Sequence, residues 1–214
     1  MLLYTYFRSS AAYRVRIALG LKGLDYTAVP VHLVKNGGEH LQPRYRQVNP
    51  GALVPTLVDG ATHIPQSLAI IEYLEETHPT PALLPYDAAG RARVRALALD
   101  VACDLHPLNN LRVLDYLTGS LGLSGTQRKD WYRHWVAVGL ATVEQRLAGH
   151  PATGRFCHGD VPTMADCCLV PQIFNAARFG CSLDGFPAIR RIVEECEQLP
   201  AFRAAAPASQ PDAE

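Results

Sequence analysis

Residues 2–23 read LLYTYFRSSAAYRVRIALGLKG, which places a short apolar run directly before a helix-like repeat. Leu2 to Phe7 is an apolar and aromatic run of strand length. From Ser10 onward, apolar residues recur at helical spacing with basic residues between them, and Gly23 marks the end. We therefore predict a strand followed by an amphipathic helix whose N-cap is Ser9 or Ser10.

The next segments extend this beginning into a sheet. Tyr26 to Leu33 alternates apolar residues with others and is predicted to be a second strand. Because a strand–helix–strand unit of about 30 residues has a right-handed crossover, the two strands should be parallel. Val54 to Val58 and Ala61 to Ile64 flank Asp59-Gly60, a strong hairpin signal.

A helix is predicted to start at Ser67 and to stop at Thr77-His78-Pro79. It should carry its apolar residues inward and Glu72, Glu75 and Glu76 outward. Three prolines without periodicity follow between residues 79 and 85, and the strand-like segments end there. We expect a domain boundary at this point, with one domain over residues 1–82 and a second over residues 88–214.

The second domain is predicted to be all-helical. Helical apolar spacing covers Ala88–Leu117, Thr126–Leu147, Thr163–Phe179 and Ala188–Leu199. Thr163 and Asp166 resemble a capping box with Asp in the place of Glu. The tail from Ala204, rich in Ala, Pro and Ser, is expected to be frayed. The fold class is therefore α/β followed by all-α.

Composition excludes several classes of function. The 214 residues carry 20 Lys and Arg against 20 Asp and Glu, so no net positive field favours nucleic acid or a membrane surface. The first residues do not resemble a signal peptide, and no apolar run reaches membrane-spanning length. Six cysteines without a CxxC pair favour buried free thiols in a reducing cytoplasm over disulfides. The eight histidines show no metal-ligand spacing, so no metal site is predicted.

Three short segments can bind an anion or an extended ligand, although each has a purely structural interpretation. Ser9 or Ser10 at a helix N-terminus either helps to hold an anion or only caps the helix. Pro55 has no N–H to donate to a neighbouring strand. The backbone of Val54 therefore either pairs with an extended ligand or belongs to an edge strand without a ligand. Gln66-Ser67 at the next helix start is again an anion cradle or a cap.

Arg8, which follows a strand, and Arg178, which ends a helix, either bind a substrate carboxylate or are solvated. His106 precedes a proline inside a long helical pattern, so a kink is expected there, with or without a ligand.

Taken together and in this order, these segments resemble the cytosolic glutathione transferases, particularly the zeta class with its maleylacetoacetate and maleylpyruvate isomerases. The resemblance spans nearly the whole chain. The segments that carry it are Phe7 to Leu19, Asn49-Pro50 through Val54-Pro55-Thr56-Leu57, Gln66 to Glu76, and His106 to Leu114.

The resemblance implies a thioredoxin-like N-terminal domain that binds glutathione, a helical C-terminal domain that supplies much of the second-substrate pocket, and a homodimer. Ser9, with Ser10, matches the serine pair that hydrogen-bonds the glutathione sulfur. Val54 before a cis Pro55 matches the partner of the cysteinyl unit, and Gln66 and Ser67 match the residues that hold the γ-glutamyl end. Further glutathione contacts are implied for Ala11, His40, His106, Asn110, Leu111 and Arg112.

One position departs from the family motif, because Ala11 stands where a cysteine is usual. The nucleophile should therefore be the sulfur of glutathione and not a thiol of this chain. Related isomerases add that thiolate to a cis dicarboxylate, allow the resulting single bond to rotate, and eliminate the thiolate. Arg8 and Arg178 match arginines that bind the substrate in these relatives.

Three functions follow from the resemblance. The first is isomerisation of maleylacetoacetate, or alternatively of maleylpyruvate. The second is conjugation or dehalogenation of small electrophiles by a broad glutathione transferase, and the third is a non-catalytic binding protein. Two arginines favour the first over the second, because neutral electrophiles do not require them. The glutathione-binding residues argue against the third.

Overall fold

The computed structural model describes residues 1–214, which form two compact units. The first unit contains Met1–Leu83 together with Glu197–Glu214, and the second contains Leu84–Cys196. No helix is long and apolar enough to cross a lipid bilayer.

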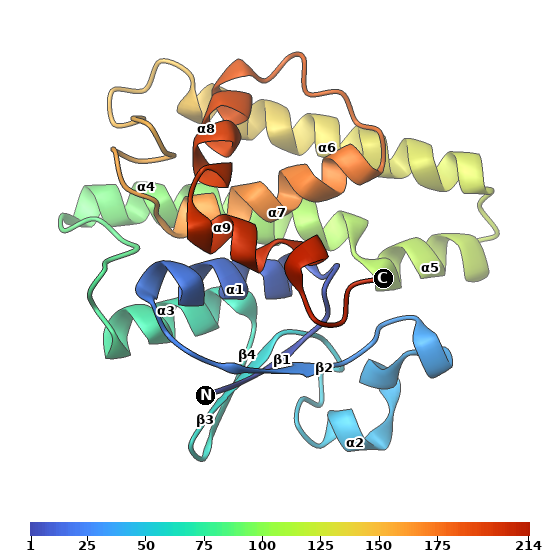
Figure 1. Cartoon of the computed structure of the whole chain (residues 1–214). Coiled ribbons are helices and arrows are strands. Elements are labelled where there is room, and N and C mark those ends of the chain that lie inside the picture. The colour runs from blue at the N-terminus through green and yellow to red at the C-terminus, as the bar shows by residue number, and fades with distance from the viewer. The chain divides into compact units, whose positions relative to one another are not determined.

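The first unit contains a four-stranded mixed sheet, which confirms the predicted topology (Figure 1). Its strands are β1 (Leu2–Thr5), β2 (Thr27–Pro30), β3 (Thr56–Asp59) and β4 (Thr62–Pro65), in the spatial order β2-β1-β3-β4. β1 and β2 are parallel, as a strand–helix–strand unit requires. β3 and β4 form the antiparallel hairpin around Asp59-Gly60. Two single-turn helices and α2 (Pro43–Arg46) connect β2 to β3.

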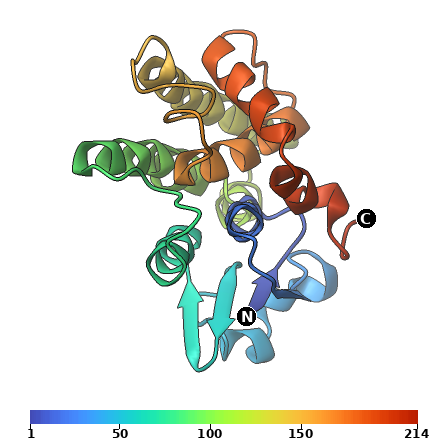
Figure 2. The same ribbon diagram turned by 60° about the vertical axis from the view of Figure 1, so that its left-hand side comes forward.

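Helices α1 (Ser10–Lys22) and α3 (Ser67–Thr77) lie side by side over one face of this sheet (Figure 2). The packed core between them consists of Leu3, Val15, Leu19, Leu57, Ile70 and Leu74. Gly23 ends α1 with φ 65°, a left-handed conformation that glycine adopts without steric cost. The predicted apolar spacing of both helices is therefore confirmed.

The polar side predicted for α1 is wrong, because its basic residues are buried. Arg14, Arg16 and Lys22 are 2%, 1% and 6% exposed. Helix α9 (Pro200–Ala205), from the end of the chain, packs along α1 and contacts one of these residues, Arg16. The guanidinium of Arg16 donates to the carbonyl of Ala205 at 3.0 Å, among other acceptors. Burial lowers the pKa of Arg16 to about 10, and electrostatic interactions with Tyr26 and Asp212 oppose this shift.

The chain after Ala204 is ordered, so the frayed tail is also a wrong prediction. The amide of Gln210 donates to the carbonyls of Ala204 and Ala206 at 2.8 and 3.0 Å. Farther along, the carboxylate of Asp212 accepts the main-chain N–H of Phe7 at 3.0 Å. The tail is therefore attached to the segment that joins β1 to α1.

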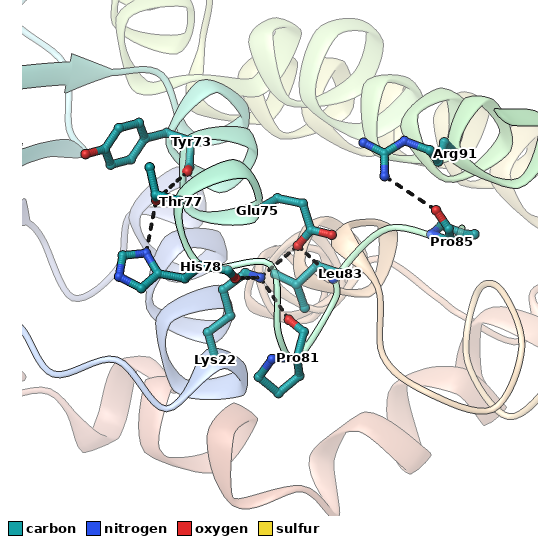
Figure 3. A network of polar contacts seen from close by, with 9 residues as sticks. All are labelled: Lys22, Tyr73, Glu75, Thr77, His78, Pro81, Leu83, Pro85 and Arg91. Atoms are coloured by element: carbon teal, nitrogen blue, oxygen red, sulfur yellow. Dashed lines mark hydrogen bonds and ion pairs between the residues drawn. The ribbon is translucent and has the colours of Figure 1, made fainter. Parts of the chain in front are cut away.

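Glu75, predicted to face outward, is buried against Lys22 (Figure 3). The Lys22 ammonium donates to the Glu75 carboxylate at 2.7 Å and to the carbonyls of His78 and Pro81 at 2.7 and 2.8 Å. The same carboxylate accepts the N–H of Leu83 at 2.9 Å. All three ammonium hydrogens therefore have acceptors, and the network fixes residues 78–83 to the ends of α1 and α3.

The second unit is helical, as predicted. Its helices are α4 (Ala88–Leu99), α5 (Leu111–Gly119), α6 (Gly125–Leu147), α7 (Met164–Arg178) and α8 (Pro187–Glu197). The helical pattern over Ala88–Leu117 is interrupted by a π-helical stretch, Asp100–Leu105, and a 3-10 turn, His106–Asn109, which confirms the break expected at His106. Pro107 lacks an N–H and cannot continue an α-helix, which accounts for the break. The capping box of Thr163 and Asp166 is confirmed at the start of α7.

Candidate active site

The sheet topology gathers three of the candidate segments at one end of the first unit. Tyr4 pairs with Thr56, and Thr56 pairs with Pro65, so the end of β1, the start of β3 and the end of β4 are neighbours. The residues that adjoin these three strand ends are Ser9 and Ser10, Val54 and Pro55, and Gln66 and Ser67. Because β2 is parallel to β1, the loop that carries His40 leaves from this same end.

Ser9 is the N-cap of α1, and its hydroxyl oxygen accepts the N–H of Ala12 at 3.2 Å. A hydroxyl that accepts one hydrogen bond still has its own hydrogen to donate. The side chain is half-buried at the positive end of the helix dipole, where an anion is stabilised. Ser10 is buried inside the first turn, and the neighbouring Ala11 presents only a methyl group. Ser9 is therefore the hydroxyl best placed to donate to an anion.

Val54 lies in the loop just before β3, and its peptide bond to Pro55 is cis. The neighbouring carbonyl of Leu53 is held by the hydroxyl of Tyr45 at 2.6 Å and by the amide of Asn49 at 2.8 Å. Burial raises the pKa of the Tyr45 phenol. No hydrogen bond within the chain engages the main-chain N–H or carbonyl of Val54. An extended peptide can therefore pair with this residue.

The backbone of Gln66 is strained. Its φ of 71° and ψ of 118° are unusual for a residue with a side chain and cost about 1–3 kcal/mol. This conformation turns the chain from β4 into α3 and leaves the Gln66 side chain exposed. Ser67 follows, and its buried hydroxyl accepts Nη1 of Arg14 at 3.2 Å. Arg14 was not among the residues expected at the site.

The loop after β2 is held in place by its own side chains and carries a half-buried His40. The carboxylate of Glu39 accepts the main-chain N–H of His32 at 2.8 Å and the amide of Asn36 at 3.3 Å. Gly38 has φ 91°, and a Cβ there would lie 2.7 Å from Cε1 of His40. The position of the imidazole therefore requires glycine at residue 38.

Arg8 is exposed, and its guanidinium carbon lies 4.7 Å from the ring centroid of Phe7. The acidic end of the chain lies in the same region, because Asp212 binds the Phe7 N–H and Glu214 pairs with Lys35. A hydrogen bond from Lys35, with smaller contributions from nearby charges that include Arg8, lowers the pKa of Glu214. The structure thus places a cation next to the Ser9 helix end.

The remaining candidates lie in the second unit. The Asn110 side chain caps α5 by accepting the N–H of Arg112 at 3.2 Å, and its amide nitrogen is 3.5 Å from Nε2 of His106. Leu111 is the first residue of α5, and the Arg112 side chain is exposed. Arg178 is exposed on the last turn of α7 and donates to the Asn175 amide oxygen at 3.0 Å. The helix break thus brings His106 and Asn110 together.

Comparison with known proteins gives a consistent answer. Residues 3–82 match the family model described as the glutathione S-transferase N-terminal domain. The maleylacetoacetate isomerase of Pseudomonas aeruginosa is 52% identical over 213 residues, which is 99% of this chain and 98% of that protein. The holo structure of a maleylpyruvate isomerase, a bacterial zeta-class glutathione S-transferase, is 50% identical, with a TM-score of 0.97 and full coverage of both chains. This chain belongs to the zeta-class glutathione S-transferases.

A third similarity concerns ligands of this class. The maleylacetoacetate isomerase of Methylobacterium extorquens AM1, solved with bound malonate and glutathione, is 41% identical, with a TM-score of 0.96 and full coverage of both chains. In this zeta-class chain, the first unit offers a hydroxyl donor at a helix N-terminus, main-chain groups at Val54 and a polar helix start at Gln66-Ser67. These groups fit a tripeptide thiol, which carries a sulfur, peptide groups and carboxylates.

Proposed function

We propose that this chain is a glutathione-dependent cis–trans isomerase that converts maleylacetoacetate to fumarylacetoacetate. The observation that carries the proposal is the full-length similarity to zeta-class isomerases, at about half of all positions. Maleylpyruvate is the second candidate substrate, because the holo maleylpyruvate isomerase is equally similar. Initial rates with each substrate, measured with and without glutathione, test the proposal and rank the two. Equal rates without glutathione would contradict it.

The proposed glutathione site begins with the sulfur at Ser9, beside Ser10 and Ala11. Val54, before cis Pro55, pairs with the cysteinyl peptide, and Gln66 and Ser67 hold the γ-glutamyl end. His40 and the group of His106, Asn110, Leu111 and Arg112 complete the proposed set. Residues 1–82 are thus the proposed glutathione-binding domain, and residues 88–214 are the proposed second domain, which contributes to the substrate pocket.

Bound glutathione supplies the thiolate that adds reversibly to the conjugated double bond and so allows rotation about it. Ser9 favours this ionised form, because its hydroxyl donates to the sulfur while its oxygen remains the acceptor for Ala12. The N-terminus of α1 adds partial positive charge. A free thiol with a pKa of about 8.5 is mostly protonated at neutral pH, so both effects raise the reactive fraction.

The proposed role of Arg8 and Arg178 is to bind the carboxylates of the dianionic substrate. A planar guanidinium binds a carboxylate with two parallel hydrogen bonds, which orients the substrate as well as attracting it. Both side chains are exposed and therefore accessible to a ligand. The reaction needs no metal in this proposal, since the arginines balance the negative charge.

Replacing Arg178 by alanine should lower kcat/KM for the dicarboxylate about ten- to a hundredfold, because a charged hydrogen bond contributes about 1.5–3 kcal/mol. Conjugation of a neutral aryl halide should change less than threefold. Steady-state kinetics on both substrates measures the difference. Arg190→Ala, at an exposed arginine of α8, is the matched control and should affect neither reaction. Equal losses on the two substrates would assign Arg178 a structural role.

We also propose that the protein is a cytoplasmic homodimer, as the resemblance to cytosolic transferases implies. Sedimentation equilibrium should then give about twice the chain mass of 23.4 kDa. A monomer mass at micromolar concentration would overturn this part of the proposal and leave the proposed reaction untouched.

A further inference from the structure

Arg14 is a buried guanidinium behind the proposed binding site for the γ-glutamyl end. It lies on α1 and is 2% exposed, and its Nη1 donates to the hydroxyl of Ser67 at 3.2 Å. Ser67 is itself 5% exposed and is the first residue of α3, the helix next to α1 in Figure 2. A buried charge costs free energy unless it is well compensated, so its position beside a binding residue requires an explanation.

The neighbouring Arg16 provides the comparison. Its guanidinium donates to Thr5 Oγ1 and to main-chain carbonyls, including those of Phe7 and Ala205. These contacts join α1 to the sheet end and to α9, and none of them reaches Ser67. Arg14 thus differs from Arg16 in contacting a side chain of the proposed glutathione site.

The Arg14–Ser67 contact determines the direction of the Ser67 hydroxyl. A guanidinium has five donors and no acceptor, so the hydroxyl hydrogen cannot point at Arg14. With one lone pair occupied, Ser67 can direct its hydrogen toward an acceptor on the ligand side. The positive charge behind the oxygen also polarises the O–H bond and makes it a stronger donor.

We propose that Arg14 is a positioning residue for glutathione, which acts through Ser67 on the α-carboxylate of the γ-glutamyl residue. This inference rests on the proposed function and adds a residue to it. Helix α1 then serves both ends of the tripeptide, because Ser9 caps it at the sulfur and Arg14 lies in its middle turns. The expected role concerns binding, not the chemical step.

Calorimetric titration of glutathione into the wild type and four variants tests the inference. We expect Arg14→Met and Ser67→Ala each to weaken glutathione binding about tenfold, as the loss of a charge-assisted contact implies. The double variant should bind within about threefold of either single variant, because both changes remove the same interaction. Arg14→Lys, which keeps a cation and a donor, should recover most of the affinity.

A kinetic measurement separates positioning from a general structural effect. At saturating glutathione, kcat of Arg14→Met should stay within about twofold of wild type, and KM for glutathione should rise about tenfold. Arg16→Met is the matched control, since the residue is an equally buried arginine of the same helix. Because Arg16 does not contact Ser67, any loss of glutathione affinity from Arg16→Met should add to the loss from Ser67→Ala in a variant that carries both changes. Circular dichroism establishes that each variant is folded, and Arg14→Gln, which removes the charge, replaces Arg14→Met if that variant does not fold.

The outcomes distinguish a failure of the proposed function from a failure of the positioning role of Arg14. Wild-type protein that fails to bind glutathione would refute the proposed function. Weaker binding by Ser67→Ala together with normal binding by Arg14→Met would overturn only the inference. Additive losses in the Arg14 and Ser67 double variant, or a fall in kcat equal to the rise in KM, would also overturn it.

Discussion

Replacing Ser9 by alanine should lower turnover of the cis dicarboxylate about a hundredfold at neutral pH, as the loss of one donor to a developing anion does in other enzymes. The hydroxyl is the proposed donor to the glutathione sulfur, and alanine offers none. Glutathione affinity should stay within about threefold, because Val54, Gln66 and Ser67 still bind the rest of the tripeptide. The loss should shrink as the pH approaches the free thiol pKa of about 8.5, since the thiolate then forms without help.

A pH–rate profile of Ser9→Ala against wild type measures this effect. Ser9 also caps α1, so the variant should lose about 1 kcal/mol of unfolding free energy in addition. Asp87→Ala is the matched control: Asp87 caps α4 by accepting the Gly90 N–H at 2.8 Å and is not part of the proposed site. It should lower stability by a similar amount with unchanged turnover. Normal turnover in Ser9→Ala would transfer the role to Ser10 or to the helix end.

Replacing Asp166 by alanine should lower the free energy of unfolding by about 3–5 kcal/mol, within the range for breaking a buried charged network. The carboxylate is fully buried and accepts Cys157 N–H at 2.9 Å and the N–H and hydroxyl of Thr163 at 2.8 Å each. Burial raises the pKa of Asp166, and these hydrogen bonds oppose that rise. Alanine leaves the buried donors without an acceptor and removes the cap of α7.

Urea unfolding of Asp166→Ala and Asp166→Asn measures this loss. Asparagine keeps one acceptor oxygen but turns an NH2 group toward Thr163, so about half of the loss should remain. Asp160→Ala is the control, because this exposed carboxylate accepts only the Arg155 N–H in the same loop. It should cost less than about 1 kcal/mol. Equal losses for Asp160 and Asp166 would contradict the importance of burial.

The first unit could be predicted from the sequence where the signals are local. Such signals depend only on neighbouring residues, as in the Leu2–Phe7 run, the Asp59-Gly60 turn and the helix start at Ser67. The parallel strand pair and the hairpin predicted from local signals are both confirmed. The polar side of α1 could not be predicted in this way. Its basic residues are buried by segments that are distant in sequence: α9 contacts Arg16, and α3 contacts Arg14 and Lys22. Periodicity carries no information about such contacts.

The candidate site follows the same division. The serine, proline and glutamine residues near strand ends were each weak indicators of a glutathione site. Only their order along the chain made the indication specific. The sequence carried no signal for Arg14, because a basic residue within a helical repeat is usually solvated. Only its contact with Ser67 in the structure connects it to the proposed site. The contact of Asp212 with the main-chain N–H of Phe7 could not be predicted either. A tail rich in Ala, Pro and Ser has the composition of a disordered end.

The most direct measurement follows maleylacetoacetate by absorbance with purified protein and glutathione at one tenth of the substrate concentration. An isomerase regenerates the thiol in every turnover, so all of the substrate should become the fumaryl isomer with no loss of free glutathione. A conjugating transferase would stop after one tenth of the substrate and consume the thiol. Complete conversion is the result expected for this chain, and arrest at one tenth would contradict its assignment as an isomerase.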